Sequence, residues 1–166
     1  MAFNFLTSRN DAIRFISSLD DNVQTTTKKQ KAAYRKYLET LDESLLTLTG
    51  TPLVFLMRPL TWATQEIASR DAKGLCVPGV YTDAPTAREL LRLSVESFEN
   101  WPKEWGDMES KFRFEYGHRV LSREWVGDLF PGLCAEAAGV LLDTLPLPAT
   151  KEGDQTGPFP EKETQD

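Results

Sequence analysis

Histidine and cysteine are almost missing from this chain of 166 residues, which has one histidine and two cysteines. A single histidine, His118, excludes a zinc site built from several histidines, and Cys76 and Cys134 cannot complete a closed structural site alone. The two cysteines form no CxxC pair and are too few for a disulfide scaffold, so we expect buried thiols in a reducing compartment. We expect no metal and no cofactor.

Short catalytic and nucleotide-binding motifs are also missing. The sequence contains no GxxxxGK[ST], GxGxxG, HExxH or GxSxG pattern. Carboxylate pairs such as Asp42/Glu43 and Glu96/Glu99 fall where helix surfaces or loops carry charge in any globular protein. These absences predict a protein that is not an enzyme.

An excess of positive charge and long apolar runs are missing too. The 25 acidic residues outnumber the 19 basic ones, so the net charge is −6 and nucleic acid is not an expected partner. No apolar run approaches the roughly 18 residues that span a membrane. The stretch Met1–Asp11 lacks the basic and then apolar order of a signal peptide. We therefore expect a cytoplasmic protein that does not bind membranes.

Residues 1–50 predict an N-terminal helical arm. Ser8 and Asp11 suit a helix cap, and a short apolar face follows at Ile13, Phe15, Ile16 and Leu19. A second helix is expected to start near Thr25–Thr27 and to end at Gly50. Its apolar residues step by three or four and form one stripe: Tyr34, Leu38, Leu41, Leu45 and Leu48.

The first half of that helix is basic on its other face, at Lys28, Lys29, Lys31, Arg35 and Lys36. A solvated face and an anion-binding groove are both open as interpretations. The acidic balance of the whole chain favours the first.

Residues 51–147 predict a core α+β domain. Leu53–Met57 is a continuous apolar run of strand length, and Pro59 ends it. Thr61 is expected to cap a helix over Trp62–Ala72 that Gly74 closes. Asp83 and Pro85 start another helix, which is expected to run to about Asn100 and to bury Val95 and Phe98.

The second half of this domain predicts another strand and a closing helix. In Lys111–Tyr116 aromatic and charged residues alternate, which predicts a half-buried strand. Gly117 and His118 turn the chain, and Ser122 caps a helix that Pro131-Gly132 divides. The second piece is expected to bury Leu133, Ala137, Val140, Leu141 and Leu145.

The predicted fold class is α+β and mainly α, a single domain of several helices around a small two- or three-stranded sheet. Residues 148–166 are acidic and almost without apolar side chains, so they predict a disordered tail.

Aromatic and apolar residues remain as candidates for binding a partner. Trp101 and Trp105 lie in a loop with proline and glycine, where they either anchor a partner or cover the core. The apolar stripe has the same two interpretations, a core face or a face that docks another helix. The candidate partner-binding residues are Tyr34, Leu38, Leu41, Leu45, Trp101 and Trp105.

Several motifs between Pro52 and Leu147 occur in an order that one protein family shares. They are Phe55-Leu-Met-Arg-Pro-Leu-Thr61, Trp101 ahead of a glycine loop, Phe112-Arg-Phe-Glu115, and the stretch Leu121–Leu142 with its Leu-Phe-Pro-Gly-Leu. In this order the chain resembles the tail assembly chaperones of long-tailed bacteriophages. Residues 1–50 depart from the usual pattern of that family.

The resemblance implies a non-enzymatic protein of the host cytoplasm. Such a protein coats the tape-measure protein and assists tail-tube subunits as they polymerise, and it often forms a homo-oligomer. Two alternatives stay open: an acidic phage-encoded inhibitor of a host defence protein, and a minor neck or connector component of the virion.

Overall fold

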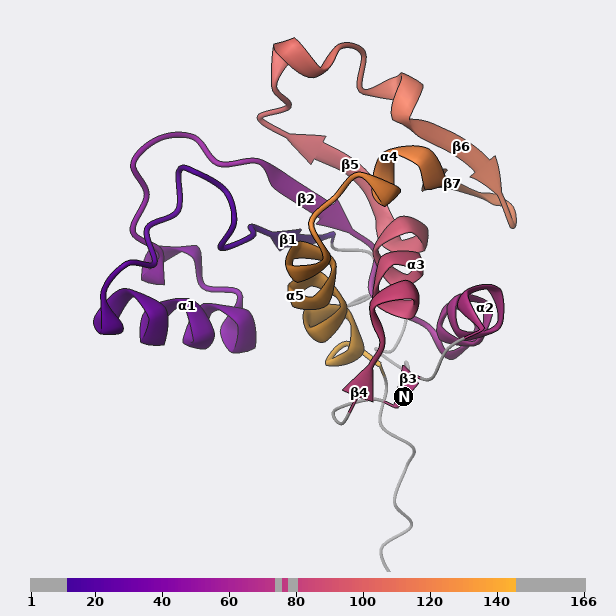
Figure 1. Ribbon diagram of the computed structural model, residues 1–166, viewed down its shortest axis with the longest axis horizontal. Coiled ribbons are helices and arrows are strands. Elements are labelled where there is room, and N and C mark those ends of the chain that lie inside the picture. Colours follow the sequence, from indigo (N-terminus) through magenta and orange to yellow (C-terminus); the bar gives the residue numbers. More distant parts are fainter. Residues whose placement is uncertain (1–11, 74–75, 78–80, 146–166) are drawn as a thin grey trace, which may run out of the picture.

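A three-stranded antiparallel sheet in the order β1-β2-β5 runs across the middle of the structure (Figure 1). The computed structural model describes residues 12–73, 76–77 and 81–145. The sheet consists of β1 (Ile13–Phe15), β2 (Val54–Met57) and β5 (Val95–Glu99). Two hairpins add β3 (Cys76–Val77) with β4 (Tyr81–Thr82), and β6 (Phe112–Glu115) with β7 (His118–Leu121).

Within the described residues, five α-helices lie around these strands. They are α1 (Lys28–Thr40), α2 (Trp62–Ala72), α3 (Ala84–Ser94), α4 (Arg123–Gly127) and α5 (Pro131–Leu142). The described connections contain the short 3₁₀ helices η1 (Glu43–Leu45), η2 (Lys103–Trp105) and η3 (Glu109–Lys111). The predicted α+β class, mainly α, is confirmed.

Strand β2 is apolar throughout because both faces of the sheet are covered. Phe55 and Met57 belong to the larger core cluster, whereas Val54 packs in a smaller one with Tyr34 and Tyr37 of α1. Successive side chains of a strand point to opposite faces, so a strand covered on both sides reads as a continuous apolar run. The strand predicted at Leu53–Met57 is therefore confirmed.

Most predicted helix starts are confirmed by the caps that the sequence suggested. The side chains of Thr27, Thr61, Asp83 and Ser122 each accept a hydrogen bond from the backbone N–H three residues on. Helix α2 has the predicted bounds, and Lys73, the residue after its end, caps it in the left-handed conformation. The predicted closing residue Gly74 lies outside the described residues, as do Ser8, Asp11 and the tail 148–166.

The predicted helix around Ile13, Phe15 and Ile16 is wrong. Ile13–Phe15 is β1, which pairs antiparallel with β2, Phe15 opposite Phe55. The neighbouring strand supplies hydrogen-bond partners for this backbone, and this outweighs a weak helical pattern. Of the first fifty residues, Ile13–Phe15 therefore belong to the central sheet.

The second predicted helix ends ten residues early. Leu41 adopts a left-handed conformation (φ 56°) after Thr40, and the Asp42 carboxylate accepts the Ser44 N–H to start η1. Side chains of this kind compete with the helical backbone for hydrogen bonds. Tyr34–Leu48 is thus not one helical stripe, and Leu48 instead forms an isolated β-bridge with Val23.

The helix predicted to reach Asn100 stops at Ser94, and the chain continues directly as β5. Val95 and Phe98 are buried as predicted, but they are buried on a strand. A short apolar run fits either a helix or a strand. Here β2 decides the outcome, because it pairs with β5 from Glu99 to Val95.

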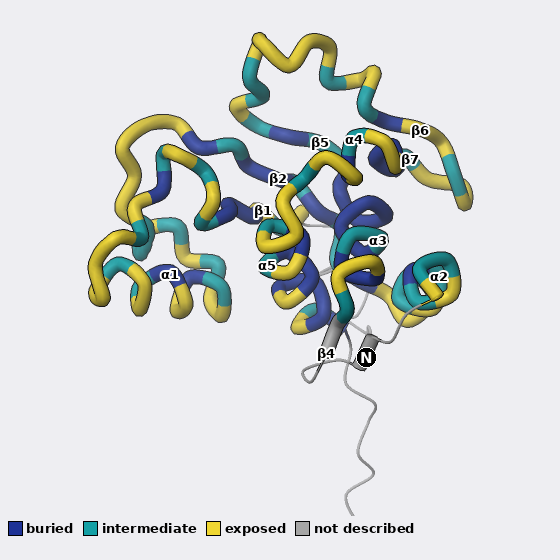
Figure 2. The backbone as a smooth tube through the Cα atoms, viewed as in Figure 1, coloured by how far each residue is buried: buried dark blue, intermediate teal, exposed yellow. Residues whose placement is uncertain are grey.

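The β6–β7 hairpin differs from the predicted half-buried strand. Phe112 is buried, but Phe114 is 78% exposed and Tyr116 is also exposed, because this two-stranded ribbon extends beyond the core (Figure 2). Tyr116 and Gly117 form its two-residue loop, both with positive φ. His118 does not complete the turn as expected but begins β7, a strand that the sequence did not predict.

Candidate partner-binding groove

Four residues of the predicted apolar stripe pack into the core clusters beside the sheet. Tyr34 is 6% exposed. Its hydroxyl accepts from the Ser18 N–H and lies 3.0 Å from both the Ile16 carbonyl and the Glu136 carboxylate, which share its one proton. Leu38, Leu41 and Leu45 are half-buried and pack against the same two clusters. These four candidates contact the chain's own core.

Trp101 and Trp105 belong to an aromatic cluster above the sheet. The Trp101 ring lies 4.9 Å from Phe98 and 5.6 Å from Trp125, and its indole N–H donates to the Gly106 carbonyl. Trp105 meets Trp101 edge to face at 5.3 Å and stays 43% exposed. Trp101 therefore covers the core, whereas Trp105 presents a fixed ring to the surface.

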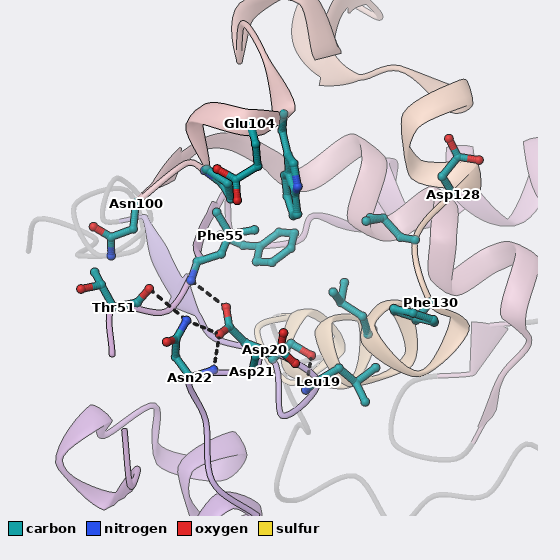
Figure 3. Close-up of a pocket in the computed structure, with 16 residues that line it drawn as sticks. Leu19, Asp20, Asp21, Asn22, Thr51, Phe55, Asn100, Glu104, Asp128 and Phe130 are labelled. Carbon is teal, nitrogen blue, oxygen red and sulfur yellow. Dashed lines mark hydrogen bonds between the residues drawn. The ribbon is translucent and has the colours of Figure 1, made fainter. Parts of the chain in front are cut away.

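Trp105 borders a groove of about 480 Å³ (Figure 3). Four segments that are distant in the sequence line it: 17–22, 51–55, 100–105 and 128–133. Phe55 contributes to its floor, and Leu19 and Phe130 are exposed at 49% and 71%. Leu19 is held against the first turn of α5, where a Cβ at Gly132 would lie 3.4 Å from its side chain.

Hydrogen bonds from side chains fix the wall of the groove nearest the sheet. The Asp20 carboxylate accepts the Leu53 N–H at 2.8 Å and the Asn22 N–H at 2.8 Å. Asn100 donates its side-chain amide to the Pro52 carbonyl at 2.9 Å. Backbone groups along this wall are thus already paired, so a partner here would be recognised by side chains and not by strand addition.

Three further carboxylates lie along the groove, those of Asp21, Glu104 and Asp128. All three residues are exposed, and their side chains make no hydrogen bond or ion pair with the described residues. No lysine, arginine or histidine stands among the described residues that line the groove. The groove therefore combines an apolar floor with an uncompensated negative charge.

Glu136 of α5 positions the loop that begins the groove. Its carboxylate accepts hydrogen bonds from the Ser17 hydroxyl (2.8 Å), the Ser18 N–H (3.1 Å), the Ser18 hydroxyl and the Tyr34 hydroxyl (3.0 Å). Burial and then the Glu136 charge raise the pKa of Tyr34 above its ordinary value. Glu136 is the one acid in an otherwise apolar helix, which is the signal that could have drawn attention to it.

The side chains of Cys134 and His118 lie apart from the groove lining. The described residues contain no group of three or more His, Cys, Asp or Glu side chains able to hold a metal ion. Cys134 is buried, which raises the pKa of its thiol and opposes a reactive thiolate. His118 is exposed.

Arg92 is the most buried charged residue that is described. It pairs with Glu89 and Glu115 and donates to the Leu121 carbonyl, which joins α3 to the β6–β7 hairpin. This ion-pair group lies apart from the groove lining. It connects elements of the fold.

Comparisons with family models, curated proteins and solved structures find no match. Among the residues described, no helix has the length and apolar character needed to cross a bilayer. The groove and the chain's own motifs are therefore the observations on which a function has to rest.

Proposed function

We propose that this protein is a non-enzymatic tail assembly chaperone of a long-tailed bacteriophage, which binds the tape-measure protein in the host cytoplasm. The observation that carries the proposal is the groove bordered by Trp105, Leu19 and Phe130. Exposed apolar and aromatic side chains that gather around one concave surface mark sites for protein partners.

The chemistry of a tape-measure protein suits such a groove. A very long and partly apolar helix aggregates on its own, and an acidic protein that covers its apolar side chains keeps it dispersed. The Leu-Phe-Pro-Gly-Leu motif behind the resemblance supplies Leu129, Phe130 and Leu133 to the groove lining. Assistance to tail-tube subunits and homo-oligomerisation belong to the same proposal.

Co-expression with a tape-measure fragment tests this function. We expect the wild-type chain to raise the soluble fraction of the fragment and to co-purify with it. The double variant Trp105→Ala/Phe130→Ser should lose both effects, because it removes two exposed side chains of the groove.

Phe114→Ser is the control, since Phe114 is more exposed than either residue but lies on β6, outside the groove lining. This variant should behave like the wild type. If the wild-type chain neither binds nor solubilises the fragment, the chaperone function is wrong.

The carboxylates of the groove favour a second candidate, the acidic inhibitor of a host defence protein. Such an inhibitor needs its negative charge gathered on one face, and Asp20, Asp21, Glu104 and Asp128 provide a local concentration of it. Pull-down from infected host cells separates the two, because an inhibitor would recover a host protein instead of a phage tail protein.

A further inference from the structure

The groove has a charge that its own residues do not balance. Four carboxylates line the groove, and of these only the Asp20 carboxylate accepts hydrogen bonds from the described residues. Asp21, Glu104 and Asp128 are exposed and make no ion pair with the described residues. A bound partner would bring these charges close to an apolar contact, where water screens them less than on an open surface.

We propose that the groove binds a cationic amphipathic protein segment. Its apolar side chains enter the groove against Phe55, Leu19 and Phe130, and its lysine or arginine side chains meet the carboxylates along the walls. This inference rests on the proposed function, because it names the chemistry of the partner at the same site. The occupant follows from charge complementarity together with the apolar floor.

Trp105 adds a second reason to expect cations. Its ring is held by Trp101 and Trp125 at centroid distances of 5.3 and 6.3 Å, and it follows Glu104 directly in the chain. An exposed indole face attracts a lysine or arginine side chain through its π electrons. Glu104 lines the same groove, so a cation bound at Trp105 would be attracted by its carboxylate as well.

A second copy of this chain is a weaker fit for the same groove. The cationic surface that the described residues offer is α1, with Lys28, Lys29, Lys31, Arg35 and Lys36 all exposed. However, the buried residues of α1, Tyr34 and Tyr37, are held in its own core. A second α1 could supply charges but no apolar anchors for the floor, so the occupant is a separate segment.

Fluorescence anisotropy with labelled synthetic peptides tests the proposal. The first peptide carries leucine and phenylalanine at helical spacing with lysine on the flanks. A second replaces every lysine by glutamate, and a third keeps the lysines but replaces the apolar residues by alanine. We expect only the first peptide to bind, with an affinity that falls as salt is added.

Neutralising the groove gives the sharper measurement. The triple variant Asp21→Asn/Glu104→Gln/Asp128→Asn should bind the first peptide about tenfold more weakly at low ionic strength, since each exposed pair contributes modestly. The control is Glu39→Gln/Glu66→Gln/Glu124→Gln, which changes the net charge equally at exposed residues outside the groove lining. It should bind like the wild type. All six positions are exposed, so both triple variants should keep the wild-type circular dichroism and unfolding midpoint.

Four other results would each overturn the proposal. Equal binding of the lysine and glutamate peptides, or equal weakening by both triple variants, would show that the groove charges do not select the partner. Self-association in sedimentation that only the groove variant abolishes would make a second copy the occupant. If the tape-measure fragment still requires Trp105 and Phe130 while the charge variants bind it normally, the chaperone function stands and this inference fails.

Discussion

The hydroxyls of two tyrosines form hydrogen bonds with backbone groups at the edge of the sheet, where a neighbouring strand would otherwise bond. β1 is an edge strand, and the Tyr37 hydroxyl accepts the Ile16 N–H at 2.9 Å and donates to the Arg14 carbonyl at 3.3 Å. Tyr34 bonds the next backbone groups, at Ile16 and Ser18. An unpaired strand edge is a template for unwanted association, so these hydroxyls both hold α1 in place and cover the edge.

The pH dependence of stability should report on these tyrosines. Burial raises the pKa of Tyr37 to about 12, well above its ordinary value of about 10. Because the folded pKa is the higher one, the stabilisation is complete below pH 10 and is lost as the pH rises to 12, at about 1.4 kcal/mol per pH unit for each such tyrosine.

Denaturant unfolding of the wild type and of Tyr37→Phe between pH 7 and pH 12 measures this effect. The variant should lose about 1–3 kcal/mol at pH 7, because it leaves the Ile16 N–H without its acceptor. It should then lose less than the wild type as the pH rises. Parallel curves for the two proteins would show that Tyr37 does not titrate in this way.

At the scale of elements, glycine suits the backbone conformation at one position, Gly117, but weakens a helix at another, Gly139. Gly117 occupies the second position of the two-residue β6–β7 loop with φ of 76°, next to Tyr116 at 52°. This loop needs positive φ at both positions, which favours glycine. Gly139 is exposed within α5, and a Cβ there would meet nothing within 4 Å.

Alanine at these two positions should therefore change stability in opposite directions. Gly117→Ala should destabilise by about 1 kcal/mol because alanine disfavours positive φ. Gly139→Ala should stabilise by about 0.5–1 kcal/mol because alanine is the better helix former. Thermal unfolding of both variants checks the pair, and a loss of stability in Gly139→Ala would mean that this helix position is more confined than the structure shows.

Helices whose first residue is preceded by a capping side chain could be predicted from the sequence alone. Thr61, Asp83 and Ser122 mark helix starts through short-range hydrogen bonds, so the sequence identified α2, α3 and α4. The errors fall where a distant partner decides. β1 and β5 are strands because β2 lies between them, and nothing within either segment records that pairing.

At the scale of the whole molecule, the groove could not be predicted because no single segment contains it. Its lining comes from four stretches between residues 17 and 133, which only the fold brings together. The sequence singled out Trp105 because an aromatic residue in a proline and glycine loop is a local feature. It missed Leu19 and Phe130, which acquire a role only because the Leu19 loop rests on the first turn of α5.

Strand β2 packs against α1 on one face and against the main core on the other, so its local unfolding is tied to that of α1. Val54 of β2 packs with Tyr34 and Tyr37, so α1 cannot leave without exposing that face of β2. We therefore expect the amides of α1 and β2 to exchange through the same opening, with equal free energies in native-state hydrogen exchange.

Val54→Ala makes this expectation specific. Removing two buried methyl groups between α1 and the sheet should lower the opening free energy of both elements by the same amount, about 1–3 kcal/mol. An independently moving arm would behave differently, because α1 would exchange by a smaller opening and β2 would keep its protection. Exchange followed residue by residue by NMR distinguishes the two. A loss of protection confined to α1 would support the separate N-terminal arm that the sequence predicts.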